Sequence, residues 1–155
     1  MRIHIGSDHA GFEAKQALAA ALAERGHDVV DHGPQEYDAL DDYPPFCLAV
    51  GAGVAGDLGS LGVVLGGSGN GEQMAANKVD GIRAALVWNE DIARLAREHN
   101  DANVISIGAR MHTSDEVLTF VEAFISTPFS GDERHVRRIH QLTEYERTGE
   151  VPPAL

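Results

Sequence analysis

The chain has 155 residues, one cysteine and a hydrophobic fraction of 43%. That length favours a single domain over residues 1–155, and the composition excludes a disordered or disulfide-stapled chain. A formal net charge of −12 argues against nucleic-acid binding, which needs a broad basic surface. The N-terminus shows no signal peptide, and no apolar run is long enough to cross a bilayer. We therefore expect a cytoplasmic protein without a membrane partner.

Strand and helix patterns alternate along the chain. Short apolar runs predict strands at residues 2–6, 29–30, 61–65, 82–88 and 104–107. Apolar residues at helical spacing predict helices at 12–25, 44–56, from about 72, at 92–100, at 114–125 with Ser114 as the N-cap, and at 132–148.

Apolar strands alternating with helices predict a parallel sheet that is covered on both faces. Sheets of this kind bind ligands beyond the carboxyl ends of their strands, where the strand order reverses. We therefore expect the chemistry to lie in residues 6–9, 66–72, 88–91 and 108–112.

The glycine-rich segment 66–71 is the strongest local signal. It has four glycines directly after a strand and before a helix, so its backbone amides can converge on a phosphate, a carboxylate or an enediolate oxygen. A P-loop is excluded because Glu72 stands where lysine is required, and the glycine spacing differs from the dinucleotide fingerprint. The alternative is a tight turn without a ligand.

Two side chains in or next to this segment, Ser68 and Glu72, each have two possible roles. Glu72 stands at the start of the next helix, where it can stabilise the helix dipole or act as a general base beside a carbonyl. Ser68 can donate a hydrogen bond to a developing oxyanion, or it is a simple turn residue.

Polar side chains also occur at other strand and helix ends. Asp8 and His9 follow the first strand, where they can hold a sugar hydroxyl or serve as turn residues. His99 and Asn100 close the fourth helix, as catalytic groups or as capping residues. Arg110 follows the fifth strand, at the expected ligand end of the sheet.

The last helix carries a cluster of basic residues. Arg134 and Arg138 are four residues apart and share a helix face, so both can meet one phosphate; a solvated charged face is the alternative. No group of His, Cys, Asp and Glu has the spacing of a metal site, and we interpret Cys47 as a packing residue.

Several of these segments together resemble the ribose-5-phosphate isomerase B family, which includes galactose-6-phosphate isomerases. The resemblance covers nearly the whole chain and is strongest with the actinobacterial branch. It rests on residues 6–11, 66–72, 75–78, 97–100 and 134–138.

The resemblance implies a Rossmann-like, three-layer α/β/α fold with a five-stranded parallel sheet and an extra C-terminal helix. It also implies homodimers, or dimers of dimers, with active sites at the subunit interface and no metal or cofactor. The implied activity is the metal-independent interconversion of ribose 5-phosphate and ribulose 5-phosphate through an enediolate, a step of the non-oxidative pentose phosphate pathway.

The resemblance also implies roles for individual residues. Many family members carry a cysteine base directly after the third strand, but Gly66 stands there in this chain. In the branch without that cysteine, the base is a glutamate, which matches Glu72. His99 is implied to assist ring opening, and Ser68 to stabilise the oxyanion. The implied substrate contacts are Asp8, His9, Tyr43, Gly67, Gly69, Asn70, Gly71, Asn100, Arg110, Arg134 and Arg138.

Two other functions remain open from the sequence. The first is isomerisation of a six-carbon sugar phosphate, such as allose or galactose 6-phosphate. The second is a non-catalytic module that binds a phosphate or nucleotide.

Overall fold

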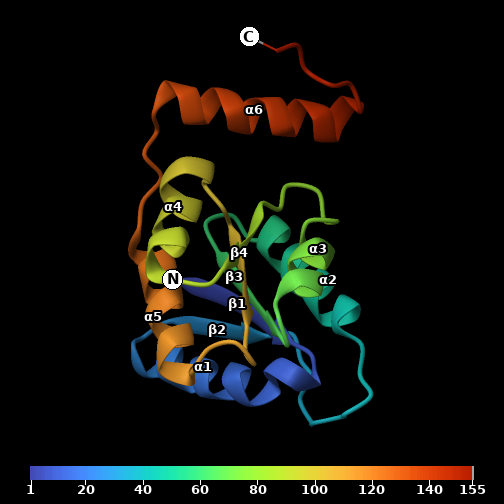
Figure 1. Ribbon diagram of the computed structural model, residues 1–155, viewed down its shortest axis with the longest axis vertical. Helices are drawn as coiled ribbons and strands as arrows, with labels where there is room; N and C mark the ends of the chain where they lie inside the picture. The colour runs from blue at the N-terminus through green and yellow to red at the C-terminus, as the bar shows by residue number, and fades with distance from the viewer. Residues whose placement is uncertain (155) are drawn as a thin grey trace.

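The computed structural model describes residues 1–154 and has a five-stranded, wholly parallel sheet at its centre (Figure 1). The strands lie in the order β2-β1-β3-β5-β4. Their bounds are β1 Arg2–Ser7, β2 Asp28–Asp31, β3 Leu61–Gly66, β4 Ala84–Val87 and β5 Val104–Gly108.

Helices cover both faces of this sheet, which confirms the predicted three-layer, Rossmann-like fold. Helices α1, α4 and α5 pack on one face, and α2 and α3 cover the other. A further helix, α6, extends away from the body and contacts mainly α4. The bounds are α1 Phe12–Glu24, α2 Tyr43–Gly56, α3 Asn70–Ala76, α4 Glu90–Asn100, α5 Ser114–Ser126 and α6 Glu133–Thr148, with a 3-10 turn at His9–Gly11.

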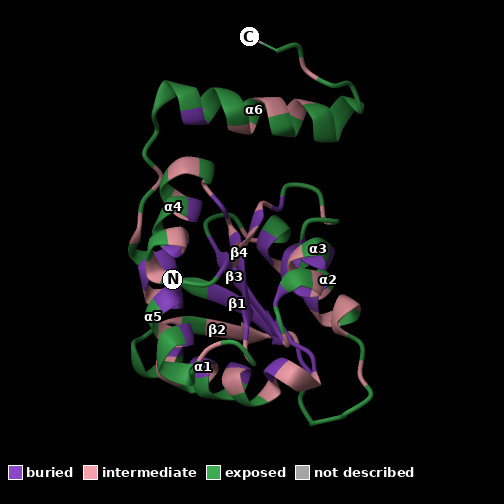
Figure 2. Ribbon diagram, in the orientation of Figure 1, coloured by how far each residue is buried: buried purple, intermediate pink, exposed green. Residues whose placement is uncertain are grey.

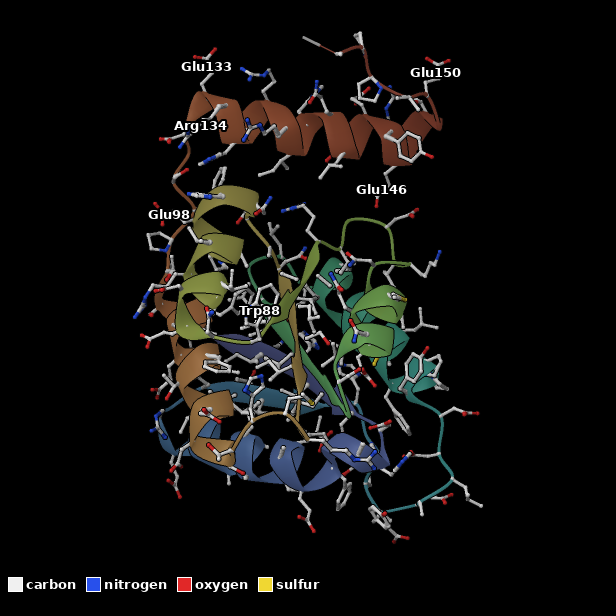
Figure 3. The ribbon with its side chains drawn as sticks, viewed as in Figure 1. Trp88, Glu98, Glu133, Arg134, Glu146 and Glu150 are labelled. Atoms are coloured by element: carbon white, nitrogen blue, oxygen red, sulfur yellow. The ribbon has the colours of Figure 1, made fainter. Side chains whose placement is uncertain are left out.

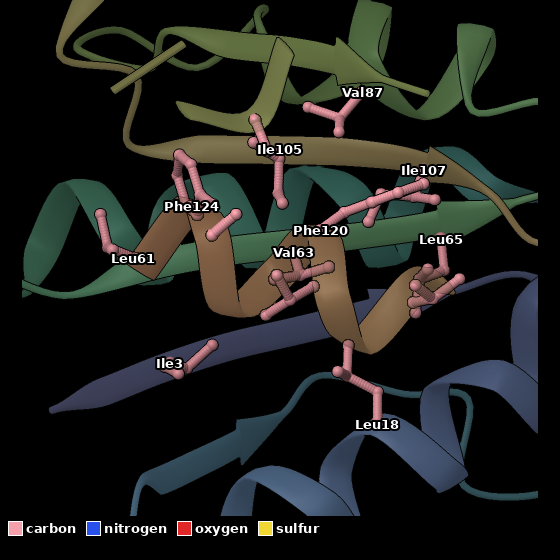
Figure 4. Packing of buried hydrophobic residues seen from close by; sticks show 14 of the residues in the cluster. Ile3, Leu18, Leu61, Val63, Leu65, Val87, Ile105, Ile107, Phe120 and Phe124 are labelled. Atoms are coloured by element: carbon pink, nitrogen blue, oxygen red, sulfur yellow. The ribbon is translucent and has the colours of Figure 1, made fainter. Parts of the chain in front are cut away.

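The core lies on the two faces of the central strands (Figure 2). Every residue of β3 is buried, and successive side chains point to opposite faces. Val63 therefore packs with Ile105 and Phe124 under α5 (Figure 4). Val64 points to the other face and packs under α2. Each buried side chain of this kind stabilises the fold by about 1.5–3 kcal/mol.

Two predicted boundaries were wrong by a few residues. The fourth strand is shorter than the predicted 82–88 at both ends: pairing with β5 begins only at Ala84, and Trp88 leads into Asn89, the N-cap of α4. The N-cap of α5 is Thr113 rather than Ser114: the Thr113 hydroxyl accepts from the amide of Glu116, whose carboxylate accepts from the amide of Thr113. This capping box satisfies two amides that one serine would leave unpaired.

The strand order creates a crevice between β1 and β3. β2 pairs with one edge of β1, and β3 pairs with the other edge of β1, so the chain turns in opposite directions after β1 and after β3. A ligand site is expected at the carboxyl ends of these two strands. The end of α4 lies at the opposite edge, because Asn100 leads into the start of β5. No helix within residues 1–154 has the length and apolar character to cross a membrane.

Candidate active site

The glycine-rich loop connects β3 to α3 at the carboxyl edge of the sheet. Gly69 has a φ of +82°, and a Cβ there would lie 3.1 Å from the amide nitrogen of Gly108. The buried hydroxyl of Ser106 donates to the carbonyl oxygen of Gly69 at 2.6 Å. The loop is therefore held against β5 by close backbone contact and by one buried hydrogen bond.

Glu72 lies in the first turn of α3 and is only 4% exposed. Its carboxyl group lies directly against Gly66, in the space that a side chain at residue 66 would need. Burial raises the pKa of Glu72, and the nearby charge of Asp8 raises it further, although backbone hydrogen bonds from Glu72 itself and Gly69 oppose the shift. A carboxylate with a raised pKa is a better proton acceptor than an exposed one.

Cys47 is fully buried in α2. Burial, together with the charges of Glu72 and Asp8, raises the pKa of its thiol. Cys47 therefore stays neutral and fills space, which agrees with its interpretation as a packing residue.

Asp8 and His9 lie at the end of β1. The carboxylate of Asp8 accepts from the amides of Ala10 and Gly11 at 2.9 and 3.2 Å, and so caps the 3-10 turn. His9 contacts Asp41, which comes from the loop before α2: Nδ1 of His9 lies 2.8 Å from Oδ1 of Asp41. This contact, against the opposing effect of desolvation, raises the pKa of His9.

Two further predicted residues, Tyr43 and Arg110, pack against the loop. The ring of Tyr43 packs on Gly71, where a Cβ would lie 2.7 Å from Cζ of Tyr43. The Arg110 side chain extends over Gly67, with Cδ 3.7 Å from where a Cβ at residue 67 would stand.

The hydroxyl of Ser68 accepts from the backbone and side-chain nitrogens of Asn70 at 3.3 and 3.1 Å. Both bonds use its lone pairs, so the hydroxyl proton of Ser68 remains available to a ligand.

The other predicted residues lie at the opposite edge of the sheet. His99 is in the last turn of α4, where its ring centroid lies 4.4 Å from that of His135 in α6. Asn100 ends α4, and Arg134 and Arg138 are exposed on α6, which lies beyond that edge (Figure 3). Within one chain, six of the predicted residues lie around the loop: Asp8, His9, Tyr43, Ser68, Glu72 and Arg110. The other four, His99, Asn100, Arg134 and Arg138, lie apart from them at the opposite edge.

Sequence reasoning missed two residues of the loop edge, Asp41 and Ser106. Asp41 stands in a polar, turn-rich segment 32 residues after its partner His9, and it belongs to no motif. Ser106 is the one hydroxyl in the apolar strand Val104–Gly108, and a buried polar side chain in such a strand was the available signal.

One cluster has side chains of the types that ligate metals: Asp8, His9 and Asp41. Their ligand atoms already make hydrogen bonds to one another or to backbone amides.

Comparisons with known proteins point to one family. The family model described as Ribose/Galactose Isomerase matches residues 3–142. Ribose-5-phosphate isomerase B of Mycobacterium tuberculosis H37Rv is 57% identical over 153 residues, which cover 99% of this chain and 94% of that protein. The Escherichia coli K12 protein of the same name is 36% identical over 94% of this chain and 97% of its own length.

Solved structures show the same fold. Ribose-5-phosphate isomerase B of Clostridium thermocellum superposes with a TM-score of 0.91 at 40% identity, covering 97% of this chain and all of that one. The Mycoplasma genitalium enzyme, solved with bound ribulose-5-phosphate, has the same TM-score and identity over 95% of this chain and 97% of its own. The family match, the sequence identities and the fold together establish that the chain belongs to the ribose/galactose isomerase family.

Proposed function

We propose that this protein is an aldose–ketose isomerase that interconverts ribose 5-phosphate and ribulose 5-phosphate. The observation that carries the proposal is the buried carboxylate of Glu72, whose pKa is raised and which lies against a glycine-rich loop at the sheet's switch point. Isomerisation needs such a base next to groups that stabilise negative charge. The names of the relatives, and the ribulose 5-phosphate in one of them, supply the substrate class.

The mechanism follows from the chemistry of these groups. Glu72 removes the proton from carbon 2 of the open-chain aldehyde and returns it to carbon 1, while the oxygen at carbon 1 gains a proton and the hydroxyl at carbon 2 loses one to become the ketone. The free hydroxyl proton of Ser68 and the amides around Gly69–Gly71 stabilise the enediolate oxygen, and a lost donor of this kind typically lowers the rate by about a hundredfold or more. His99 assists ring opening by proton transfer, and no step requires a metal or cofactor.

We further propose that the site is shared between two copies of the chain. A six-residue strand such as β3 spans about 20 Å, so His99 and Glu72 of one chain lie too far apart to act on one pentose phosphate. In a symmetric dimer, the loop edge of one copy can meet His99, Asn100, Arg134 and Arg138 of the other. The arginines would then hold the phosphate, with Arg110 from the loop side.

Exposed apolar side chains support this assembly. Trp88 is 54% exposed at the end of β4 (Figure 3). Leu142 and Tyr145 of α6 are similarly exposed. The three line a groove of about 850 Å³ between α6 and the body. Few apolar contacts hold α6 to its own chain, so a second copy is the natural cover for this surface.

A six-carbon sugar phosphate is the second candidate substrate, because the matching family model includes galactose isomerases. A reducing compartment suits the single free thiol of Cys47, and we propose that the enzyme works in the cytoplasm.

The test is conversion of ribose 5-phosphate to ribulose 5-phosphate by the purified protein in excess EDTA. We expect rapid turnover that EDTA leaves unchanged. Turnover of allose or galactose 6-phosphate alone would replace the five-carbon substrate. Tight binding of ATP or FMN without any isomerisation would overturn the proposal and indicate a binding module.

A further inference from the structure

Asp41 holds His9 through two hydrogen bonds to a single oxygen. The backbone amide and the ring Nδ1 of His9 each lie 2.8 Å from Oδ1 of Asp41. The side chain of Asp41 is only 10% exposed, whereas that of His9 is 26% exposed. The carboxylate is thus shielded behind the ring, and the ring reaches the surface of the site.

This contact determines which ring nitrogen of His9 faces a ligand. A carboxylate can only accept hydrogen bonds, so Nδ1 of His9 must carry a proton. Nε2 is then the nitrogen that is left to meet a substrate. The next residue, Ala10, lies beside the loop: its Cβ is 3.8 Å from where a Cβ at Gly67 would stand. His9 therefore stands at the same edge of the sheet as the loop that carries Glu72.

The charges around His9 favour its protonated form. Asp41 accepts the Nδ1 proton, and Oδ2 of Asp8 lies 3.9 Å from the same nitrogen. These are the charged groups that face His9 within residues 1–154, from the loop before α2 and from the end of β1. The hydrogen bond to Asp41 is the largest cause of the raised pKa of His9.

The remaining oxygen of Asp41 is in an unfavourable environment. Oδ2 is buried and has no hydrogen-bond partner in the described part of the chain. A buried carboxylate oxygen without a partner costs stability, so the fold alone gives little reason for an aspartate here. The contact with His9 supplies a functional reason.

We propose that Asp41 is a positioning residue for the isomerisation, and this rests on the proposed function. It holds His9 with Nδ1 protonated and the ring positively charged, so that Nε2–H donates a hydrogen bond to an oxygen of the sugar phosphate. Asp41 itself does not touch the substrate.

The variant Asp41→Asn separates charge from geometry, because its amide oxygen can still accept both hydrogen bonds from His9. The matched control is Asp38→Asn, in the same loop, where Oδ1 accepts only from the amide of Leu40, at 3.0 Å. The measurements are NMR titration of the His9 ring, with ¹⁵N shifts to assign the tautomer, and kcat/KM for ribose 5-phosphate as a function of pH.

We expect Asp41→Asn to lower the pKa of His9 and to move the alkaline limb of kcat/KM to lower pH. Activity should stay near that of the unmodified protein at acid pH, where the ring is protonated in both proteins, and should fall at alkaline pH by about tenfold for each unit by which the pKa of His9 drops. Asp38→Asn should change neither quantity.

Two results would overturn the proposal: an unchanged His9 titration in Asp41→Asn, or an equal loss of activity at every pH. The second would indicate a purely structural role. The NMR titration needs no turnover, so failure of the unmodified protein to isomerise the sugar would count against the proposed function and leave the Asp41–His9 contact separately measurable.

Discussion

The space beside Gly66 fixes the position of the Glu72 carboxylate, the proposed base, and Gly66→Ala tests this directly. A Cβ at residue 66 would overlap the carboxyl group of Glu72, with Oε2 at 2.7 Å and both Cδ and Oε1 closer still. An ordinary contact needs about 3.4 Å or more, so the Glu72 side chain must leave its site. Overpacking of this kind typically costs about 1–3 kcal/mol of stability.

The expected loss of activity is larger than the expected loss of stability. Removing a general base lowers the rate by about 10²–10⁴-fold, so we expect kcat of Gly66→Ala to fall at least about a hundredfold. The KM should change little, because the arginines proposed to bind the phosphate are not touched. Each kcal/mol of stability that is lost should lower the melting temperature by about 2–4 °C.

Steady-state kinetics and thermal unfolding measure these effects side by side. Gly56→Ala is the matched control, because a Cβ there meets no atom within 4 Å. If Gly66→Ala kept kcat within about threefold of the unmodified protein, the assignment of Glu72 as a base held by this space would be wrong.

Three further predictions concern the same site. Glu72→Gln should abolish turnover. Because burial raises the pKa of Glu72 in the fold, the stability of the unmodified protein falls as pH rises through that pKa, so the variant should melt higher near neutral pH, and an equal or lower melting temperature would contradict the burial argument. Ser106→Ala removes the buried hydrogen bond to the carbonyl of Gly69, which keeps its bond from the amide of Gln73, so it should cost about 0.5–1.5 kcal/mol in urea unfolding and lower kcat, whereas unchanged kinetics would show that the loop needs no such tether. Arg138→Ala should raise KM for ribose 5-phosphate far more than it lowers kcat, and an unchanged KM would refute the phosphate role.

Local patterns predicted much of the fold and one half of the site. The all-apolar run Leu61–Leu65 and the glycines after it are adjacent in sequence, so strand, loop and the position of Glu72 could be read together. The strand order could not be predicted in this way, because the pairing of β5 between β3 and β4 depends on packing between distant segments.

The rest of the site depends on tertiary contacts. Asp41 meets His9 only because the loop before α2 folds back over the end of β1, and no spacing in the sequence encodes that contact. The separation of His99 from Glu72 follows from the direction of α4, which runs antiparallel to the strands. Sequence motifs identify both residues but do not show that they lie at opposite edges of one chain.

Subunit complementation tests most directly the claim that one active site takes Glu72 from one chain and His99 from another. The variants Glu72→Gln and His99→Asn are each expected to be inactive alone. When they are unfolded together and refolded as a mixture, random pairing gives half mixed dimers with one complete site each, so about a quarter of the full activity should return. No recovery in a mixture shown to contain mixed dimers would contradict the shared site.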